Sequence, residues 1–380
     1  MPKSVIKIIH TTISPCDNER RIFNQAITAY HQGYSVEILA LKTSELPEIS
    51  KVNQITIKRI AIRFWRKGPL KFLSFNIKLF FRLLNCDFHI LHVHDLWVVP
   101  GSALANFFKK GILVYDAHEY FRGLEVFQQK KISGFIWAIT ERLFIKRISA
   151  LIVINGWHQR LFLKDYPSIK KSTVIMNFPN LTDSGNQETI PGFEQRNKIA
   201  IFQGILKEGR GLRSILSAME RVKSGKLQII GFGELESELR HRINTDRLQN
   251  RIHLRGKVAW SEILQETQKA RAGLVLFEPL SVNYTYASPN KFFEYVMAGT
   301  PLIASRIPTF EEFNREFEVA LLVDPSRPEE IASAIEFMLT RQDAWETYHQ
   351  NCLKARLKWN WETQGEALVQ LYQELAESII

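Results

Sequence analysis

Short apolar runs alternate with stretches of helical periodicity along most of the chain. This alternation is typical of parallel sheets whose two faces are covered by helices. In the first half, apolar runs predict strands near residues 5–10, 35–41, 54–60, 88–93, 112–117, 150–154 and 173–177. In the second half, they predict strands near residues 199–203, 227–231, 252–255, 273–277, 301–304 and 319–323. We therefore predict an α/β protein with two doubly wound, Rossmann-like domains that face each other across a cleft.

A polar segment separates the two series of strands. Residues 182–197 are rich in Asn, Gly, Gln, Glu and Pro and lack helical periodicity, as expected of a linker. We place an N-terminal domain at residues 1–180 and a C-terminal domain at residues 181–358. The apolar spacing within residues 359–380 predicts a final amphipathic helix. Ligands of such sheets bind beyond the carboxyl ends of the strands, so we expect the functional residues there.

The segment 288–301 has the pattern of a helix aimed at a ligand, with a Ser-Pro start, a Gly stop and a Pro-led strand behind it. The first turn of a helix leaves backbone N–H groups without partners, so a turn formed by Pro289, Asn290 and Lys291 suits a phosphate. Glu294 lies about one turn deeper, where its carboxylate can accept hydrogen bonds from a vicinal diol such as a ribose. The alternative is an ordinary helix that covers the sheet.

A second motif opens the C-terminal half. An apolar run over residues 200–203 leads into Gly204, and a short turn with Arg210 and Gly211 precedes a helical pattern. Glycines let the backbone approach a phosphate closely, and the forked side chain of Arg210 can bind two phosphate oxygens at once. Gly231 belongs to a similar turn between the next strand and helix. The alternative is that these glycines serve only the geometry of their own turns.

The two motifs together resemble the donor site of the retaining glycosyltransferases of family 4, which have the two-domain GT-B architecture. The resemblance implies that Glu294 binds the ribose of a sugar nucleotide and that Arg210 binds its diphosphate. The family carries a further basic residue where this chain has Ile205, and often a further glutamate where this chain has Tyr286. Recognition of the sugar must therefore differ here. In that family the final helix crosses back to the N-terminal domain, and we expect the same of residues 359–380.

In the first half, histidines and acids follow two predicted strands. His92 and His94 end one strand, and the sequence Asp-Ala-His-Glu around His118 follows the next. In the resembled family a histidine at this place lies near the donor sugar and the acceptor, so we expect His118, Arg210 and Glu294 to be catalytic. The spacings match no zinc pattern, which favours a hydrogen-bonding role for His92 and His94. We expect no metal and no other cofactor.

The first loop of the chain differs from that of many family members. Residues 11–21 lack a Gly-Gly pair and resemble the variant in which an Asp and an Arg lead the first helix. We therefore hypothesise that Arg20 or Arg21 contacts the acceptor or a phosphate.

Composition narrows the class of protein. The chain has 380 residues, and its 45% hydrophobic content is enough for two ordinary cores. Three scattered cysteines form neither a disulfide framework nor a metal motif, which favours the cytosol. We read no secretory signal, and no apolar run reaches the roughly 18 residues of a spanning helix. We expect a cytoplasmic protein whose contact with the inner face of the cell membrane, if any, is peripheral.

Positive charge is concentrated in one segment. The formal net charge is +11, and residues 58–82 contain eight Lys or Arg and no acid, interleaved with aromatic residues. Lys71, Lys78 and Arg82 fall on one face of a helical pattern, as in a helix that lies on an anionic membrane. A core helix with a solvated basic strip is an equally weighted alternative. No nucleic-acid-binding motif accompanies the segment, so we expect no nucleic acid as partner.

These patterns predict a hexosyltransferase-type enzyme that moves a sugar from a nucleoside-diphosphate sugar to an acceptor hydroxyl. UDP is favoured over GDP, and the expected acceptor is a glycolipid or a polysaccharide precursor. By the resemblance, the anomeric configuration is retained. Two alternatives stay open, namely an epimerase of a sugar nucleotide, which would act without an acceptor, and a two-domain sensor, whose ligand would stay intact.

Overall fold

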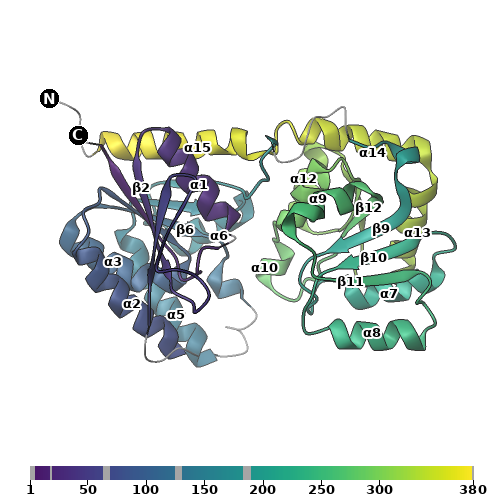
Figure 1. Cartoon of the computed structure of the whole chain (residues 1–380), viewed down its shortest axis with the longest axis horizontal. Helices are drawn as coiled ribbons and strands as arrows, with labels where there is room; N and C mark the ends of the chain where they lie inside the picture. Colours follow the sequence, from purple (N-terminus) through teal and green to yellow (C-terminus); the bar gives the residue numbers. More distant parts are fainter. Residues whose placement is uncertain (1–4, 18, 63–68, 125–130, 183–189, 379–380) are drawn as a thin grey trace. The chain divides into compact units, whose positions relative to one another are not determined.

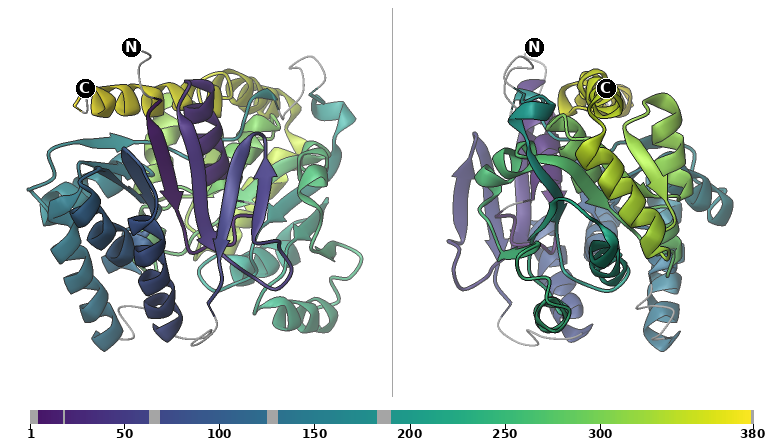
Figure 2. Two further views of the ribbon diagram at one scale, coloured as in Figure 1. Left: turned by 60° about the vertical axis from the view of Figure 1, so that its left-hand side comes forward. Right: turned by 90° about the vertical axis from the view of Figure 1, so that its right-hand side faces the viewer.

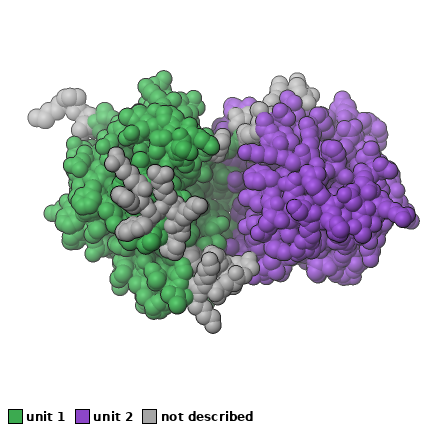
Figure 3. Space-filling view, turned by 60° about the horizontal axis from the view of Figure 1, so that its bottom comes forward, with its two compact units in different colours: residues 1–177, 363–380 green, residues 178–362 purple. Residues whose placement is uncertain are grey.

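The computed structural model describes residues 5–17, 19–62, 69–124, 131–182 and 190–378 (Figure 1). The chain forms two compact units, each built on its own sheet, which confirms the predicted α/β class with two Rossmann-like domains. Unit 1 comprises residues 1–177 and 363–380, and unit 2 comprises residues 178–362 (Figure 3). The end of the chain thus belongs to the same unit as its beginning.

Unit 1 contains an eight-stranded sheet in the order β3-β4-β2-β1-β5-β6-β7-β8. Its strands are β1 (Lys7–Thr11), β2 (Ser35–Leu41), β3 (Ile49–Val52), β4 (Ile55–Ile60), β5 (Ile90–His94), β6 (Ile112–Ala117), β7 (Ala150–Val153) and β8 (Ser172–Val174). All neighbouring strands are parallel except β3 and β4, which form an antiparallel pair. The sequence pattern missed β3 because this edge strand buries none of its side chains, so no apolar run marks it.

Helices cover both faces of this sheet. On one face lie α1 (Arg20–His31) and α15 (Trp361–Glu377), and on the other lie α2 (Pro69–Leu84), α3 (Val99–Lys109) and α5 (Lys131–Phe144) (Figures 1 and 2). The shorter elements are η1 (Leu96–Val98), η2 (Phe121–Gly123), η3 (Ile145–Arg147) and α6 (Gly156–Asp165). The two faces follow from right-handed crossovers, because the chain passes from β1 to β2 in one direction and from β5 to β7 in the other.

Unit 2 contains a six-stranded, entirely parallel sheet in the order β11-β10-β9-β12-β13-β14. Its strands are β9 (Asn197–Gln203), β10 (Lys226–Ile230), β11 (Ile252–Gly256), β12 (Ala270–Val275), β13 (Leu302–Ser305) and β14 (Ala320–Val323). Its helices are η6 (Phe193–Gln195), α7 (Leu212–Arg221), α8 (Glu236–Thr245), α9 (Trp260–Gln268), α10 (Val282–Thr285), α11 (Asn290–Met297), α12 (Pro308–Glu316), α13 (Pro328–Thr340) and α14 (Gln342–Ala355). Each strand predicted for this half overlaps an observed one.

Apolar faces fix these helices on their sheet. On α7, Ile215, Leu216 and Met219 recur at helical spacing, and all three are fully buried in the core of unit 2. Burial of each such side chain contributes roughly 1.5–3 kcal/mol relative to exposure. Because α7 follows β9 directly, its packing also fixes the loop that joins them.

Each sheet has one point where the chain reverses its direction of travel across the strands. In unit 1, β1 separates β2 from β5, and in unit 2, β9 separates β10 from β12. Loops that leave neighbouring strands there diverge to opposite faces, which leaves room for a ligand at the carboxyl ends. Arg210 and Gly204 follow β9, whereas His118 follows β6, one strand further from β1 than β5.

Two points concern membranes. Part of the predicted basic segment, residues 63–68, lies outside the described residues, and its described helical part is α2. Among the helices that the structure describes, none combines the length and the hydropathy needed to span a bilayer.

Candidate active site

Asp116, the next-to-last residue of β6, is the centre of a buried polar network in unit 1. Arg21 on α1 donates to both carboxylate oxygens, with Nε 3.0 Å from Oδ2 and Nη2 2.6 Å from Oδ1. Gln25 on the same helix donates to Oδ2 at 2.8 Å. Burial by itself would raise the pKa of Asp116, but the charges of Arg21 and His118 hold it well below its ordinary value. Asp116 is therefore a buried carboxylate that stays ionised.

His118 lies one residue beyond β6, between two carboxylates. Its Nε2 is 3.4 Å from Oδ2 of Asp116, and its Nδ1 is 3.2 Å from Oδ2 of Asp95. Burial by itself would lower the pKa of His118, but the charges of Asp95 and Asp116 raise it above its ordinary value. The His118 side chain is 23% exposed, whereas that of Asp116 is fully buried. The network thus presents a readily protonated imidazole at the carboxyl end of the sheet.

Asp95, which the sequence analysis did not single out, holds His118 in place. Its φ of 66° lies in the left-handed region, which residues other than glycine seldom adopt. Its Oδ1 accepts a hydrogen bond from the backbone N–H of His118 at 3.1 Å, and its own N–H donates to the carbonyl of Asp116 at 2.9 Å. These bonds tie the end of β5 to the end of β6. The sequence signal that could have identified Asp95 is its position directly after a strand that ends in His94.

His10, His92 and His94 form a buried stack beside the Asp116 carboxylate. The ring centroids of His10 and His92, and those of His92 and His94, are 4.6 Å apart, with planes inclined by 17° and 19°. His10 Nδ1 and His94 Nε2 share a hydrogen bond of 2.9 Å, and His92 Nδ1 shares one of 2.6 Å with the hydroxyl of Tyr372 on α15. Burial lowers the pKa of all three histidines, that of His94 to about 3. They are neutral at pH 7.

The same side chains lie close enough together to be weighed as a metal site. Ligand atoms of His10, His92 and His94, and likewise those of His94, Asp116 and His118, all lie within 4.8 Å of one another. The rings of His10, His92 and His94 are nearly parallel, so their nitrogen lone pairs lie in separate parallel planes, whereas a bound ion needs them to converge on one point. In the second group the His94 and His118 rings are inclined by 64°, but the Asp116 carboxylate already accepts hydrogen bonds from Arg21 and Gln25. The geometry therefore fits a hydrogen-bonded network better than a metal centre.

Arg21 does not have the role that the sequence suggested. Its side chain is buried, and besides Asp116 it binds the carbonyl of Ile175, to which Nη1 donates at 2.7 Å. The hypothesis of a contact with the acceptor or a phosphate is therefore wrong for Arg21, because its guanidinium is engaged inside unit 1. For the half-buried Arg20 the same hypothesis stays a prediction.

Two glycine-containing loops meet beyond β9 and β10 in unit 2. Gly231 has a φ of 152°, and a β-carbon there would lie 1.9 Å from the carbonyl oxygen of Gly204. Gly211 precedes α7 with a φ of 67°, and its β-carbon would lie 2.6 Å from that of Leu276. Both positions require glycine for close approach of the backbone alone. A contact of these glycines with a ligand stays a prediction.

Arg210 lies against two aromatic rings. Its guanidinium carbon is 4.4 Å from the ring centroid of Phe277 and 5.6 Å from that of Tyr284 on α10. The ring of Tyr284 also lies on the loop itself, because a β-carbon on Gly209 would be 2.3 Å from Tyr284 Cε2. The Tyr284 hydroxyl donates to the carbonyl of Glu208 at 3.2 Å. Tyr284, which the sequence analysis did not assign, therefore clamps the loop that carries Arg210.

The two departures from the family pattern lie in the same region. Ile205, at the place of the first basic residue, is exposed, and Tyr286 is half-buried at the end of α10. The Nζ of Lys207 is 5.5 Å from the ring centroid of Tyr284, against which Arg210 also packs. Lys207 thus places a positive charge near the position where Ile205 replaces the first basic residue of the family.

The start of α11 holds a lysine side chain that lacks a hydrogen-bond partner among the described residues. Pro289 precedes the helix, and no side chain caps its first turn. Lys291 is buried, its Nζ has no hydrogen-bond partner among the described residues, and it lies 3.9 Å from the ring centroid of Phe202. Burial, reinforced by the charge of Arg210, lowers the pKa of Lys291 well below its ordinary value. An anion at the start of this helix would give Lys291 its missing partner.

Glu294, one turn further along α11, is fixed to the end of β9. Its Oε2 accepts a hydrogen bond from Nε2 of Gln203 at 2.8 Å, and Oε1 of Gln203 accepts one from Thr267 at 2.9 Å. The hydroxyl of Tyr295 accepts from the backbone N–H of Gln203 and donates to the carbonyl of Ile201, each at 3.1 Å. The Gln203 side chain was not recognised in the sequence, since it is simply the last residue of a predicted strand.

The structure therefore brings the predicted residues of the C-terminal half together. Arg210 and Lys291 both approach Phe277, whose ring centroid is 4.4 Å from the Arg210 guanidinium carbon and 5.7 Å from Lys291 Nζ. Two cations and a helix N-terminus can hold a diphosphate, and the Glu294 carboxylate can accept hydrogen bonds from hydroxyl groups. His118 belongs to unit 1 and is described there by itself.

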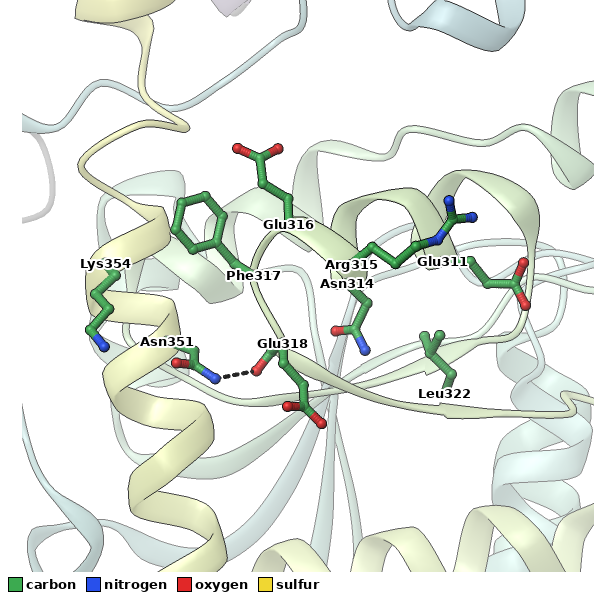
Figure 4. Close-up of a pocket in the computed structure, with 9 residues that line it drawn as sticks. All are labelled: Glu311, Asn314, Arg315, Glu316, Phe317, Glu318, Leu322, Asn351 and Lys354. Carbon is green, nitrogen blue, oxygen red and sulfur yellow. Dashed lines mark hydrogen bonds between the residues drawn. The ribbon is translucent and has the colours of Figure 1, made fainter.

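A cavity of about 800 Å³ in unit 2 lies elsewhere (Figure 4). It is formed by the end of α12, the chain leading into β14 and one side of α14. It is lined by Glu311, Asn314, Arg315, Glu316, Phe317, Glu318, Leu322, Asn351 and Lys354. Asn351 donates to the carbonyl of Glu318 at 2.9 Å, as the dashed line in Figure 4 marks. None of the predicted site residues lines it, and it lies at the amino end of β14.

Two family models match the two halves of the chain. The model described as Glycosyltransferase Family 4 matches residues 19–182, and the model described as Glycosyl transferases group 1 matches residues 197–341. The chain is similar to the phosphatidyl-myo-inositol mannosyltransferase of Mycobacterium leprae, with 24% identity over 367 residues, or 91% of this chain and 90% of that protein. The corresponding Mycobacterium tuberculosis protein is 23% identical over 316 residues, covering 78% of this chain and 76% of its own.

Solved structures share the fold. Sucrose-phosphate synthase from Thermosynechococcus elongatus has a TM-score of 0.76 at 17% identity, and the match covers 98% of this chain and 100% of that protein. The Anabaena protein HepE in complex with UDP-glucose has a TM-score of 0.74 at 16% identity, covering 97% of this chain and 100% of its own. At such identities the likeness concerns the architecture of the two units.

Proposed function

Since this chain belongs to the family 4 glycosyltransferases of GT-B architecture, we propose that it transfers a sugar from a nucleoside-diphosphate sugar to a hydroxyl of a glycolipid or polysaccharide precursor. One observation carries the donor part of the proposal. Lys291 is a buried amine without a hydrogen-bond partner among the described residues, at the start of α11 and close to Arg210. Burial of an unpaired polar group is unfavourable, and a diphosphate would remove that penalty.

The proposed chemistry rests on stabilising the leaving group. As the sugar departs, negative charge develops on the diphosphate, and prearranged cations and helix N-termini stabilise it. Arg210, Lys291 and the starts of α7 and α11 would supply this stabilisation without a metal. Glu294 would bind the ribose hydroxyls. The backbone of Gly204, Gly211, Gly231, Pro289 and Asn290 would line the diphosphate.

His118 is the proposed contact of unit 1 with the reacting sugar. Its imidazole is held by Asp95 and Asp116 in a form that binds a proton readily. In that form it donates hydrogen bonds, which suits a sugar hydroxyl or an oxygen that gains negative charge. We propose that transfer retains the anomeric configuration, as in other enzymes of the resembled family.

The donor and acceptor classes have support from named relatives. HepE, whose fold this chain shares, forms a complex with UDP-glucose, which supports UDP ahead of GDP as the carrier. The mycobacterial relatives are named for transfer to phosphatidyl-myo-inositol, which supports an acceptor in a membrane. We accordingly propose that the enzyme works at the inner face of the cell membrane, with the basic segment 58–82 as one contact. No observation favours an epimerase or a sensor.

Thermal unfolding with a panel of nucleotides tests the donor site. A ligand at about 100 times its Kd stabilises the folded state by about 2.7 kcal/mol, which shifts Tm by roughly 5–10 °C in a domain of this size. UDP, GDP, ADP, TDP and CMP should be compared on the wild type and on Arg210→Ala. We expect one diphosphate to raise Tm and the substitution to abolish the shift. If none of the five raises the Tm of the wild type, the proposed donor site is wrong.

A further inference from the structure

The helix α5 exposes a row of large apolar side chains to solvent. The residues recur at spacings of three and four, which places them on one face of the helix. Their exposed fractions are 80% for Ile132, 67% for Phe135, 56% for Ile136, 42% for Ile139 and 63% for Leu143. Single exposed apolar residues are ordinary, but a contiguous row of five on one helix marks an interaction surface.

The row continues onto the two neighbouring helices. α2 exposes Leu70, Leu73, Ile77 and Phe81, and α3 exposes Leu104, Phe107 and Phe108. The helices are joined by ring contacts, since Trp137 of α5 meets Phe72 of α2 at 5.8 Å between centroids, and Phe80 of α2 meets Phe108 of α3 at 6.1 Å. All three helices cover the same face of the sheet (Figures 1 and 2). We call their exposed residues the α2/α3/α5 face.

The charges on this face have one sign. Among the described side chains of the three helices, Glu141 is the only acid, and it is buried, where it accepts hydrogen bonds from Tyr115 and Tyr166. The basic side chains of the face are at least partly exposed, and they are Lys71, Lys78, Arg82, Lys109 and Arg142, followed just after α5 by Lys146 and Arg147. Asp87, in the loop after α2, is exposed and pairs with Lys109 at 3.4 Å.

We propose that the α2/α3/α5 face docks on a bilayer that contains anionic lipids, with the apolar row of α5 inserted among the lipid chains. Apolar side chains flanked by Lys and Arg, with no acid exposed on the helices, are what such a surface binds. A second copy of the chain fits less well, because it would bring like charges together. The proposal extends beyond the basic segment 58–82, since α5 carries the largest apolar exposures and lies outside that segment.

The position of the α2/α3/α5 face relative to His118 indicates what docking on a bilayer would do. α5 follows β6, so its first residues lie at the carboxyl edge of the sheet, where His118 also lies. A bilayer on this face would therefore bring lipid headgroups toward that edge. This consequence rests on the proposed function, because it concerns a lipid-linked acceptor, whereas the docking itself does not.

Vesicle flotation of the full chain, without donor or acceptor, tests the docking. Phosphatidylcholine vesicles with and without phosphatidylglycerol should be compared. We expect about tenfold or stronger binding to the anionic vesicles. The double variant Phe135→Gln/Ile139→Gln should lose about tenfold or more, because two apolar side chains no longer insert. Its matched control is Ile49→Gln/Leu357→Gln, which removes two side chains of 60% and 56% exposure from other surfaces and should bind as the wild type does.

A second pair of variants isolates charge. Arg82→Gln/Arg142→Gln should weaken binding to anionic vesicles about tenfold or more, whereas Lys223→Gln/Lys354→Gln should not. Equal melting temperatures would show that all variants fold. Wild type that stays unbound, or an α5 variant that binds as well as its control, would overturn the proposal. So would a wild-type dimer, measured by sedimentation, that the α5 variant dissociates. Failure of docking would leave the nucleotide shift intact, so the two proposals fail separately.

Discussion

Lys291→Met should stabilise the ligand-free protein while abolishing its response to a nucleoside diphosphate. The lysine Nζ is buried without a hydrogen-bond partner among the described residues, and methionine fills a similar space without a charge. A buried polar group without a partner destabilises the folded state by about 1–3 kcal/mol in mutational data, and an ammonium by more. The ring of Phe202, at 3.9 Å, offsets roughly 0.5–2 kcal/mol of this penalty.

The balance predicts a gain of about 1–2 kcal/mol, or roughly 2–8 °C in Tm for a unit of this size. The gain should depend on pH. The folded-state pKa of Lys291 is lowered, so between that value and the ordinary value near 10.4 the unfolded chain binds more protons than the folded one. Wild-type stability therefore rises with pH across this window, and the advantage of the variant shrinks as the pH approaches 10.

Calorimetric or fluorescence melts of wild type and variant at several pH values between 6 and about 10, with and without UDP, measure both effects. Lys226→Met, at an exposed lysine at the start of β10, is the control and should change neither Tm nor ligand response. A variant that melts below the wild type would show that burial of the Lys291 ammonium does not destabilise the folded protein. A variant that keeps the full UDP shift would show that Lys291 does not bind the diphosphate. Either result would exclude Lys291 as a buried cation kept for the diphosphate.

Further predictions concern the two networks. Asp116→Asn removes the charge that pairs with buried Arg21, so the free energy of unfolding should fall by about 3–5 kcal/mol, measured by urea titration. Asp95→Asn should lower the raised pKa of His118, so the loss of kcat/KM with rising pH should begin at lower pH, whereas an unchanged pH profile would exclude this coupling. Tyr284→Ala should raise KM for the donor about tenfold by releasing the phosphate-binding loop, while Tyr284→Phe, which keeps the ring, should not.

Strand positions were predictable because parallel strands buried on both faces read as continuous apolar runs. The same rule explains the missed strand β3, whose exposed edge position requires no apolar residue. The start of α11 was recognised from Ser-Pro and Gly at its ends, since these residues have positional preferences that are local in sequence. Burial of Lys291 is not local, because it depends on Phe202 and Phe277 from two other segments, so no sequence pattern announces it.

The site in unit 1 shows the same limit. His118 could be located at a strand end, but its carboxylate partners depend on the register of β5 against β6, which aligns His94 with Asp116 and brings Asp95 beside His118. The exposed apolar row on α5 was also not predictable from the sequence. Its residues follow the helical period that normally marks a face turned toward the core, and only the packed structure reveals that the row faces outward.

Transfer of a sugar from a nucleoside-diphosphate sugar to an acceptor hydroxyl is the activity that we propose for this enzyme. The most direct measurement is release of the nucleoside diphosphate from UDP- and GDP-sugars, with and without a membrane lipid extract, followed by mass spectrometry of the lipids. We predict release that requires the acceptor, a lipid that gains one sugar, and loss of both in Arg210→Ala. Donors that stay intact with every acceptor, or that change their sugar without any acceptor, would contradict the account.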